Sequence, residues 1–227
     1  MVIKIGHRGA GGYAPGNTLL SVQKALTFKL DYIEIDVSVC KSGEIVAVHD
    51  TRVDQTTDGS GFVTDKTFKE LSDLIVTGGQ KIPTLQEILD LIDRKIRINI
   101  EIKGTNVARS LVNLIKTYVQ EKNWRYSDFL ISSFNHYELK QMYGLCPDVK
   151  MGAVIAGIPI GYAESAQKLH AYSIHLSKEF ITPEFVDDAH RRDLKVFVYT
   201  INDAAYYEKV TAMGVDGIFT DFPDLFI

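Results

Sequence analysis

The chain contains 227 residues, carries a net charge of -4 at pH 7 and is 45% hydrophobic. Its length is sufficient for one large core, so we expect a single domain over residues 1–227, and its acidic balance argues against nucleic-acid binding. No apolar run is long enough to span a bilayer, and a strand-like run at residues 2–5 leaves no room for a signal peptide. Cys40 and Cys146 lack a metal-binding spacing, so we expect a cytoplasmic protein with free, buried thiols.

Short β-rich runs alternate with amphipathic helical patterns along the chain. The strands are predicted at residues 2–6, 31–37, 97–103, 129–133, 149–155, 172–176, 194–200 and 215–220. The helices are predicted at residues 17–29, 84–94, 107–122, 135–143, 162–169, 182–192 and 203–213. Helix N-caps are predicted at Asn17-Thr18, Thr84, Thr182-Pro183 and Asn202-Asp203. Because this alternation is typical of parallel strands joined by crossover helices, the sequence predicts a (β/α)8 TIM-like barrel.

One segment, at about residues 38–80, interrupts the alternation. It is rich in Gly, Asp and Thr and is too long for a simple connection between a strand and a helix. We interpret it as a small insertion after the second strand, on the rim formed by the C-terminal ends of the strands. The insertion carries His49 and could cover a bound substrate, although its distal part could equally be a surface connection.

Acids, histidines and cations form four clusters in the first half of the chain, and three of the four lie at or just past the end of a strand-like apolar run. The clusters are His7-Arg8-Gly9, Glu34-Ile35-Asp36, His49-Asp50 and Glu101-Ile102-Lys103. A period of two places Glu34 and Asp36 on one face of their strand, and residues 98–103 repeat the pattern. Carboxylates that converge from two strands form an oxygen-rich pocket suited to a hard divalent cation, and the histidines with Arg8 and Lys103 would complete a phosphate-handling site.

Each of these strands, taken singly, has a second interpretation. Alternating apolar and charged residues are also typical of a half-exposed antiparallel strand. The repeated placement of His, Asp and Glu at strand ends favours one shared rim instead.

The remaining histidines have weaker functional signals. His136, His170 and His190 lie in helical patterns, so we expect solvated or packed side chains there. His175 lies in the sixth predicted strand and could line the barrel mouth. Phe134 follows the fourth strand and could contact substrate or pack in the core.

Several motifs together carry a resemblance to a known family. They are His7-Arg8-Gly9, residues 14–19, residues 32–37, Val48-His49-Asp50, Thr56-Thr57, residues 83–87, Glu101-Ile102-Lys103 and residues 214–221. On these motifs the chain resembles the glycerophosphodiester phosphodiesterase family over nearly its whole length. The resemblance implies a TIM-like barrel that hydrolyses glycerophosphodiesters, which are small molecules, to sn-glycerol 3-phosphate and an alcohol.

The resemblance also implies roles for individual residues. Glu34, Asp36 and Glu101 would be metal ligands, and His7 and His49 would be the general acid and base, in an order that the sequence leaves open. Arg8 and Lys103 would bind the phosphate and stabilise the charge that develops on it. Ligands that are all oxygen favour one Mg²⁺ or Ca²⁺ ion, with Mn²⁺ as an alternative, over zinc. The sequence makes no prediction about oligomeric state.

The chain departs from the family pattern at two positions. Gly16 stands where a glutamate is usual, and Gln55 stands where an arginine is common. These changes keep a non-catalytic phosphate-ligand binder open as an alternative. A lysophospholipase D-type enzyme on the same barrel is a second alternative, which would need an apolar groove or exposed hydrophobic loop at the rim, and no such segment is evident from the sequence.

Overall fold

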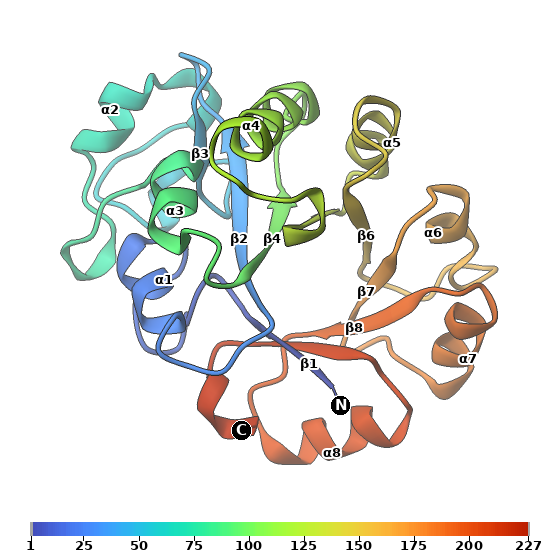
Figure 1. The fold of residues 1–227 in the computed structure, drawn as a ribbon. Coiled ribbons are helices and arrows are strands. Elements are labelled where there is room, and N and C mark those ends of the chain that lie inside the picture. Colours follow the sequence, from blue (N-terminus) through green and yellow to red (C-terminus); the bar gives the residue numbers. More distant parts are fainter. Residues whose placement is uncertain (1, 227) are drawn as a thin grey trace.

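A computed structural model describes residues 2–226, and it has a ring of strands enclosed by helices (Figure 1). The strands are β1 (Ile3–Gly6), β2 (Tyr32–Val39), β3 (Ile45–Ala47), β4 (Arg97–Ile102), β5 (Phe129–Ser133), β6 (Lys150–Ile155), β7 (Ser173–Ser177), β8 (Lys195–Tyr199) and β9 (Gly217–Thr220). The α-helices are α1 (Leu19–Ala25), α2 (Phe68–Asp73), α3 (Leu85–Ile92), α4 (Ala108–Glu121), α5 (His136–Leu145), α6 (Glu164–Lys168), α7 (Pro183–Arg191) and α8 (Ala204–Ala212).

The ring closes because β1 pairs with both β2 and β9. All of the ring's neighbouring strands are parallel, in the order β1, β9, β8, β7, β6, β5, β4 and β2. The short strand β3 pairs in antiparallel register with the end of β2 and lies outside the ring. Within residues 2–226 the fold is therefore a closed barrel of eight parallel strands with one extra strand, which confirms the predicted (β/α)8 class.

The predicted element boundaries agree with the structure to within a few residues. Side chains of Thr18, Thr84, Thr182 and Asp203 accept backbone hydrogen bonds at the starts of α1, α3, α7 and α8, and Pro183 occupies the first turn of α7. The sequence analysis missed α2, because this helix of six residues is too short to show a clear helical period.

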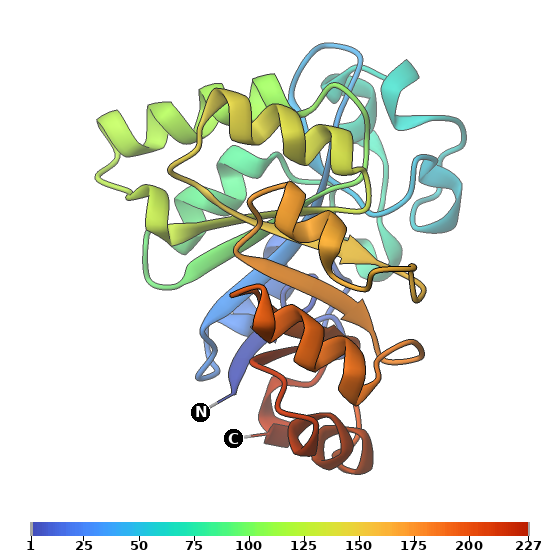
Figure 2. The same cartoon turned by 90° about the vertical axis from the view of Figure 1, so that its right-hand side faces the viewer.

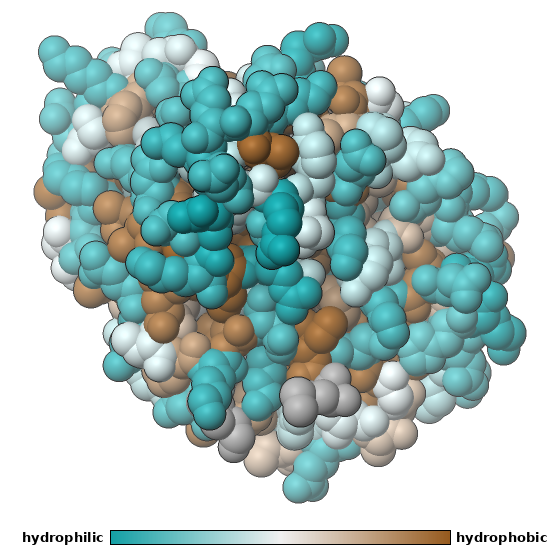
Figure 3. All heavy atoms as spheres, in the orientation of Figure 1, coloured by the Kyte–Doolittle hydropathy of each residue, from teal (hydrophilic) through white to brown (hydrophobic). Residues whose placement is uncertain are grey.

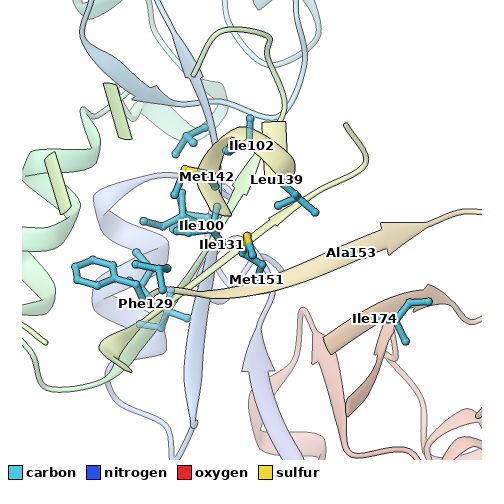
Figure 4. Close-up of a cluster of buried hydrophobic side chains, with 14 of the residues drawn as sticks. Ile100, Ile102, Phe129, Ile131, Leu139, Met142, Met151, Ala153 and Ile174 are labelled. Atoms are coloured by element: carbon cyan, nitrogen blue, oxygen red, sulfur yellow. The ribbon is translucent and has the colours of Figure 1, made fainter. Parts of the chain in front are cut away.

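Alternation along the strands separates two layers of side chains. On β2, Ile33, Ile35 and Val37 point outward and join the large cluster between barrel and helices. Figure 4 shows part of this cluster, where Ile100 and Ile131 of neighbouring strands lie beneath Leu139 and Met142 of α5. Because the strands are covered on both faces, their alternation does not indicate a half-exposed antiparallel sheet.

The inward-facing side chains form the second layer. Ile5, Tyr32, Leu130, Phe197 and Phe219 make a compact apolar cluster inside the barrel. Glu34 and Asp36 share the inward face of β2 with Tyr32, since they lie two and four residues further along the strand. The barrel is thus filled by apolar residues near the N-terminal strand ends and becomes polar toward the C-terminal ends.

The segment after β2 packs around a small core of its own. Its buried residues are Cys40, Val46, Val48, Val53, Val63, Leu71, Val76 and Ile82. Figure 2 shows this segment in cyan, on the side of the molecule toward which the arrowheads of β6 and β7 point. The segment therefore stands over the C-terminal ends of the strands, and it presents His49 there.

The cysteines, the helices and one face of the surface can be compared with what the sequence predicts. Cys40 and Cys146 are both buried and free, as predicted. No helix within residues 2–226 combines the length and apolar character that crossing a membrane requires. The face seen in the orientation of Figure 1 is covered mainly by hydrophilic residues, with apolar residues in small separate groups (Figure 3).

A buried carboxylate begins α4 in place of a conventional N-cap. Val107 precedes the helix and has no capping side chain, but Glu138 of α5 accepts hydrogen bonds from the backbone N–H groups of Asn106, Val107 and Ala108 at 2.6, 3.1 and 2.8 Å. We expect Glu138→Gln to lower the free energy of unfolding by about 2–3 kcal/mol, because one amide oxygen cannot replace two charged acceptors. Chemical denaturation measures this loss, and the exposed Glu121→Gln on α4 is the control, for which we expect no change.

Candidate active site

Three carboxylates meet inside the C-terminal end of the barrel. Glu34 and Asp36 come from β2 and Glu101 comes from the neighbouring strand β4, where Asp36 and Glu101 are register partners. All three side chains are buried, and one oxygen of each lies within 4.8 Å of the others. The period-two alternation that the sequence displays thus brings the three predicted ligand residues together.

Two cations lie against these carboxylates. The ammonium of Lys103 lies 3.2 Å from Asp36 Oδ1 and forms an ion pair with Glu101. The guanidinium Nε of Arg8 lies 3.3 Å from Asp36 Oδ2, and the Arg8 backbone N–H donates to Glu34 Oε2 at 2.7 Å. Both predicted phosphate-binding cations therefore lie at the same site as the acidic cluster.

The pKa values in the cluster reflect burial and mutual repulsion. Burial, reinforced by the charges of Asp36 and Glu101, raises the pKa of Glu34 well above its usual value. Burial also raises the pKa of Glu101. Burial acts in the same direction on Asp36, but Lys103 and Arg8 outweigh it and hold that pKa below the usual range.

The cluster fits a divalent cation on the evidence of its own atoms. Three carboxylates face only two cations, and Glu34 Oε1 is a buried oxygen for which residues 2–226 supply no hydrogen-bond partner. An all-oxygen donor set at this spacing matches the ligands that Mg²⁺ and Ca²⁺ prefer. The cluster opens into a cavity of about 140 Å³ that is also lined by Phe134, His175 and Tyr199.

Both predicted histidines line this cavity, and each is oriented by a carboxylate. His7 Nδ1 lies 2.7 Å from Asp221 Oδ1, and His49 Nδ1 lies 2.8 Å from Asp50 Oδ1. Arg8 Nε donates to His7 Nε2 at 3.3 Å, so His7 Nε2 is an acceptor and Nδ1 carries the proton. In both residues Nδ1 is bonded to a carboxylate, so Nε2 is the ring nitrogen that faces the cavity, where His7 Nε2 is shared with Arg8.

Asp221 is a positioning residue to which the sequence analysis assigned no role. It follows β9, and Asn202 donates to its second carboxylate oxygen at 2.6 Å. Asn17 was predicted only as part of a helix N-cap, but its side chain also donates to Asp36 Oδ2 at 2.9 Å. Both residues lie in motifs that carry the family resemblance, and their position after a predicted strand or before a helix was the signal that could have identified them.

The three histidines that were predicted to be solvated or packed lie away from the acidic cavity. His136 bonds the carbonyl of Val154, His170 stacks on Tyr143, and His190 pairs with Asp216, all on outer helices or loops. Phe134 is 46% exposed and lies edge-on to Tyr199, so it is a rim aromatic and not a core residue.

His175 lies inside the barrel beside the acidic cavity. Its Nε2 lies 2.9 Å from Ser173 Oγ, and its ring packs against Phe197 and Phe219. The absence of a side chain at Gly152 makes room for the ring, since a Cβ there would collide with it. Burial lowers the pKa of His175 to about 3, so the imidazole is neutral in the folded protein at physiological pH.

This burial has a consequence for acid stability. Because the folded-state pKa of about 3 lies below the unfolded value of 6.5, the unfolded state binds the extra proton, and stability falls as pH drops from 6.5 toward 3. Between pH 6.5 and 3 we therefore expect the free energy of unfolding of His175→Gln to fall by about 1.4 kcal/mol less per pH unit than that of the wild type. Unfolding free energies measured between pH 6 and 4 test this, and an unchanged pH slope would contradict it. The exposed His170→Gln is the control, for which we expect the wild-type slope.

A second, larger cavity of about 480 Å³ adjoins the acidic one. It lies between the loop that precedes α1 and the segment after β2, and it shares His7, Arg8 and His49 with the acidic cavity. Gly16 lines it, at a backbone φ that is not positive, and a Cβ there would lie 2.9 Å from Arg8 Cβ. A side chain at this position would therefore press on Arg8, and the glycine leaves that wall of the cavity open.

The loop after β6 carries exposed apolar side chains at the same rim. Ile160 is fully exposed and Ile158 is half exposed, with Gly157 and Gly161 on either side. This exposed hydrophobic loop was not evident from the sequence. The segment is too short and too interrupted by glycine and proline to show an apolar run in the sequence.

Comparisons with known proteins identify relatives of this chain. The model of the "Glycerophosphoryl diester phosphodiesterase family" matches residues 7–225. A glycerophosphodiester phosphodiesterase of Caldanaerobacter subterraneus subsp. tengcongensis is 36% identical, with 98% of this chain and 95% of that protein covered. One from Bacillus altitudinis is 31% identical, with 96% and 94% covered.

A solved structure extends the likeness to the whole fold. The phosphodiesterase of Oleispira antarctica, determined in complex with its product sn-glycerol-3-phosphate, superposes with a TM-score of 0.88 at 29% identity, covering 97% of this chain and 93% of that one. The family match over nearly the whole chain agrees with the motifs that the sequence displays. The chain therefore belongs to the glycerophosphoryl diester phosphodiesterase family and is a phosphoric diester hydrolase.

Proposed function

We propose that the chain hydrolyses glycerophosphodiesters to sn-glycerol 3-phosphate and an alcohol in one barrel domain over residues 1–227. In this proposal Glu34, Asp36 and Glu101 hold one divalent cation, Mg²⁺ or Ca²⁺ with Mn²⁺ as an alternative. When bound, such an ion supplies positive charge that stabilises the negative charge developing on the phosphate oxygens. The insertion at about residues 38–80 brings His49 to the site, and a cytoplasmic location remains part of the proposal.

The chain's own residues divide the remaining work. Arg8 and Lys103 place positive charge beside the carboxylates, where they would orient the diester and stabilise its transition state. One of His7 and His49 accepts a proton at Nε2 from the attacking oxygen as the new P–O bond forms. The other donates a proton to the leaving oxygen as the old P–O bond breaks, because an aliphatic alkoxide is a poor leaving group.

The pairing of each imidazole with a carboxylate is the observation that carries this proposal. The bonds from Asp221 to His7 and from Asp50 to His49 turn Nε2 of both rings toward a three-carboxylate cluster, where His7 Nε2 accepts a hydrogen bond from Arg8 Nε. A structural metal site or a simple anion-binding site needs no such pair.

The experiment that tests the proposal is turnover by purified protein supplied with Mg²⁺, Ca²⁺ or Mn²⁺. The substrates are glycerophosphocholine, glycerophosphoethanolamine and glycerophosphoglycerol, and the readout is release of sn-glycerol 3-phosphate. If no diester is hydrolysed while glycerol phosphate binds, the hydrolase proposal fails and a phosphate-ligand binding protein takes its place.

A second candidate activity rests on the exposed loop after β6. Ile158 and Ile160 at the rim offer apolar contact to an acyl chain, which favours lysophospholipids as a further substrate class cleaved on the headgroup side of phosphate. Ile160→Ser would then lower hydrolysis of lysophosphatidylcholine without changing hydrolysis of glycerophosphocholine. Equal effects on both substrates, or no hydrolysis of the lysophospholipid, would remove this candidate.

A further inference from the structure

The larger of the two cavities differs sharply in chemistry from the acidic one. It is roughly three times as large, and the two meet at His7, Arg8 and His49. A diester whose phosphorus lies between these three residues has one half in the acidic cavity and the other in the larger cavity. The walls of the larger cavity therefore determine which alcohol fits there.

Those walls carry uncharged polar groups at the side formed by the insertion. Gln55, Thr56 and Thr77 line the cavity, and within residues 2–226 their side chains make no hydrogen bond to another residue. Their amide and hydroxyl groups are therefore available both to donate and to accept hydrogen bonds. Apart from His49, the remaining lining on this side is apolar and comes from Ala47, Val48, Val76 and Ile82.

The same walls lack what a cationic alcohol would need. Among the described lining residues the single carboxylate is Asp221, and both of its oxygens already bond His7 and Asn202. Apart from the imidazoles of His7 and His49, the single aromatic ring among the described lining residues is that of Phe222, which is packed edge-on against Tyr13. A quaternary ammonium group is held by carboxylates or by several aromatic rings, and here it would instead face the Arg8 guanidinium.

We propose that this cavity receives the alcohol half of the diester and selects uncharged polyols, such as glycerol or inositol, with Gln55 as a specificity-determining residue. The inference rests on the proposed function, which supplies the diester. The polyol hydroxyls pair with Gln55, Thr56 and Thr77, whereas choline leaves these groups unpaired and brings its charge toward Arg8.

The test compares kcat/KM for glycerophosphoglycerol and glycerophosphoinositol with that for glycerophosphocholine. We expect the polyol esters to be favoured about tenfold or more. Gln55→Glu keeps the length of the side chain and adds a negative charge, so it should shift the ratio toward the choline ester by about fivefold or more. The matched control is Gln80→Glu, which adds the same charge in the same segment but outside the cavity, and it should leave the ratio unchanged.

A binding measurement separates this inference from the proposed function. Calorimetry with the His7→Ala protein, which should bind the esters without rapid turnover, should rank the same esters in the same order. A choline ester that is preferred in both assays, or a Gln55→Glu shift no larger than that of Gln80→Glu, overturns the inference while hydrolysis stands. Failure of the wild-type protein to hydrolyse any diester overturns the proposed function, and the inference with it.

Discussion

Removal of divalent cations is expected to abolish hydrolysis of glycerophosphodiesters, and addition of Mg²⁺, Ca²⁺ or Mn²⁺ is expected to restore it. Without a cation, three buried carboxylates lie beside the proposed phosphate position and would repel its charge, because Lys103 and Arg8 balance only part of theirs. Activity measured in excess chelator and after readdition of each ion tests this. Full activity of a metal-free protein would sink the prediction.

Substitution of single metal-binding carboxylates tests the same prediction through the affinity for the metal ion. Glu34→Gln, Asp36→Asn and Glu101→Gln each remove one of three anionic ligands, so each should weaken metal binding about 10²-fold or more, measured by calorimetry. Asp36→Asn should also disturb Arg8 and Lys103, because both lie against that carboxylate. Glu208→Gln on the outer helix α8 is the matched control and should bind the ion as the wild type does.

Loss of either proposed proton-transfer residue is the second large effect. His7→Ala and His49→Ala should each lower kcat by about 10²–10⁴-fold, because neither the attacking nor the leaving oxygen then exchanges its proton with a positioned group. Metal affinity should stay close to wild type, since neither ring is assigned to the ion. The double variant should be far less impaired than the product of the two single effects, because the two residues act as a unit.

The control for this pair is His170→Ala. His170 lies on the outer surface, so this variant should leave kcat unchanged. A fall in metal affinity that matches the fall in kcat would make the histidine a ligand instead. Turnover close to wild type in either variant would remove that residue from the mechanism.

The barrel and the carboxylate cluster could be predicted from the sequence because both depend on short-range periodicity. Alternation on β2 and β4 sends Ile33, Ile35 and Ile100 outward and the acids inward, and parallel strands place equivalent ends at one rim. The caps Thr84 and Asp203 could be identified for the same reason, since each acts within three residues.

What the tertiary structure decided depends on pairs far apart in the chain. Asp221 orients His7 across 214 positions, and Glu138 begins α4 from the following helix, so no local pattern reveals either bond. The exposure of Ile160 and the two adjoining cavities likewise follow from how loops pack over the rim. Local sequence determines which face of a strand a side chain occupies, because backbone geometry sets that period. The folded chain alone determines which distant polar groups satisfy one another, because those contacts form only when the barrel closes.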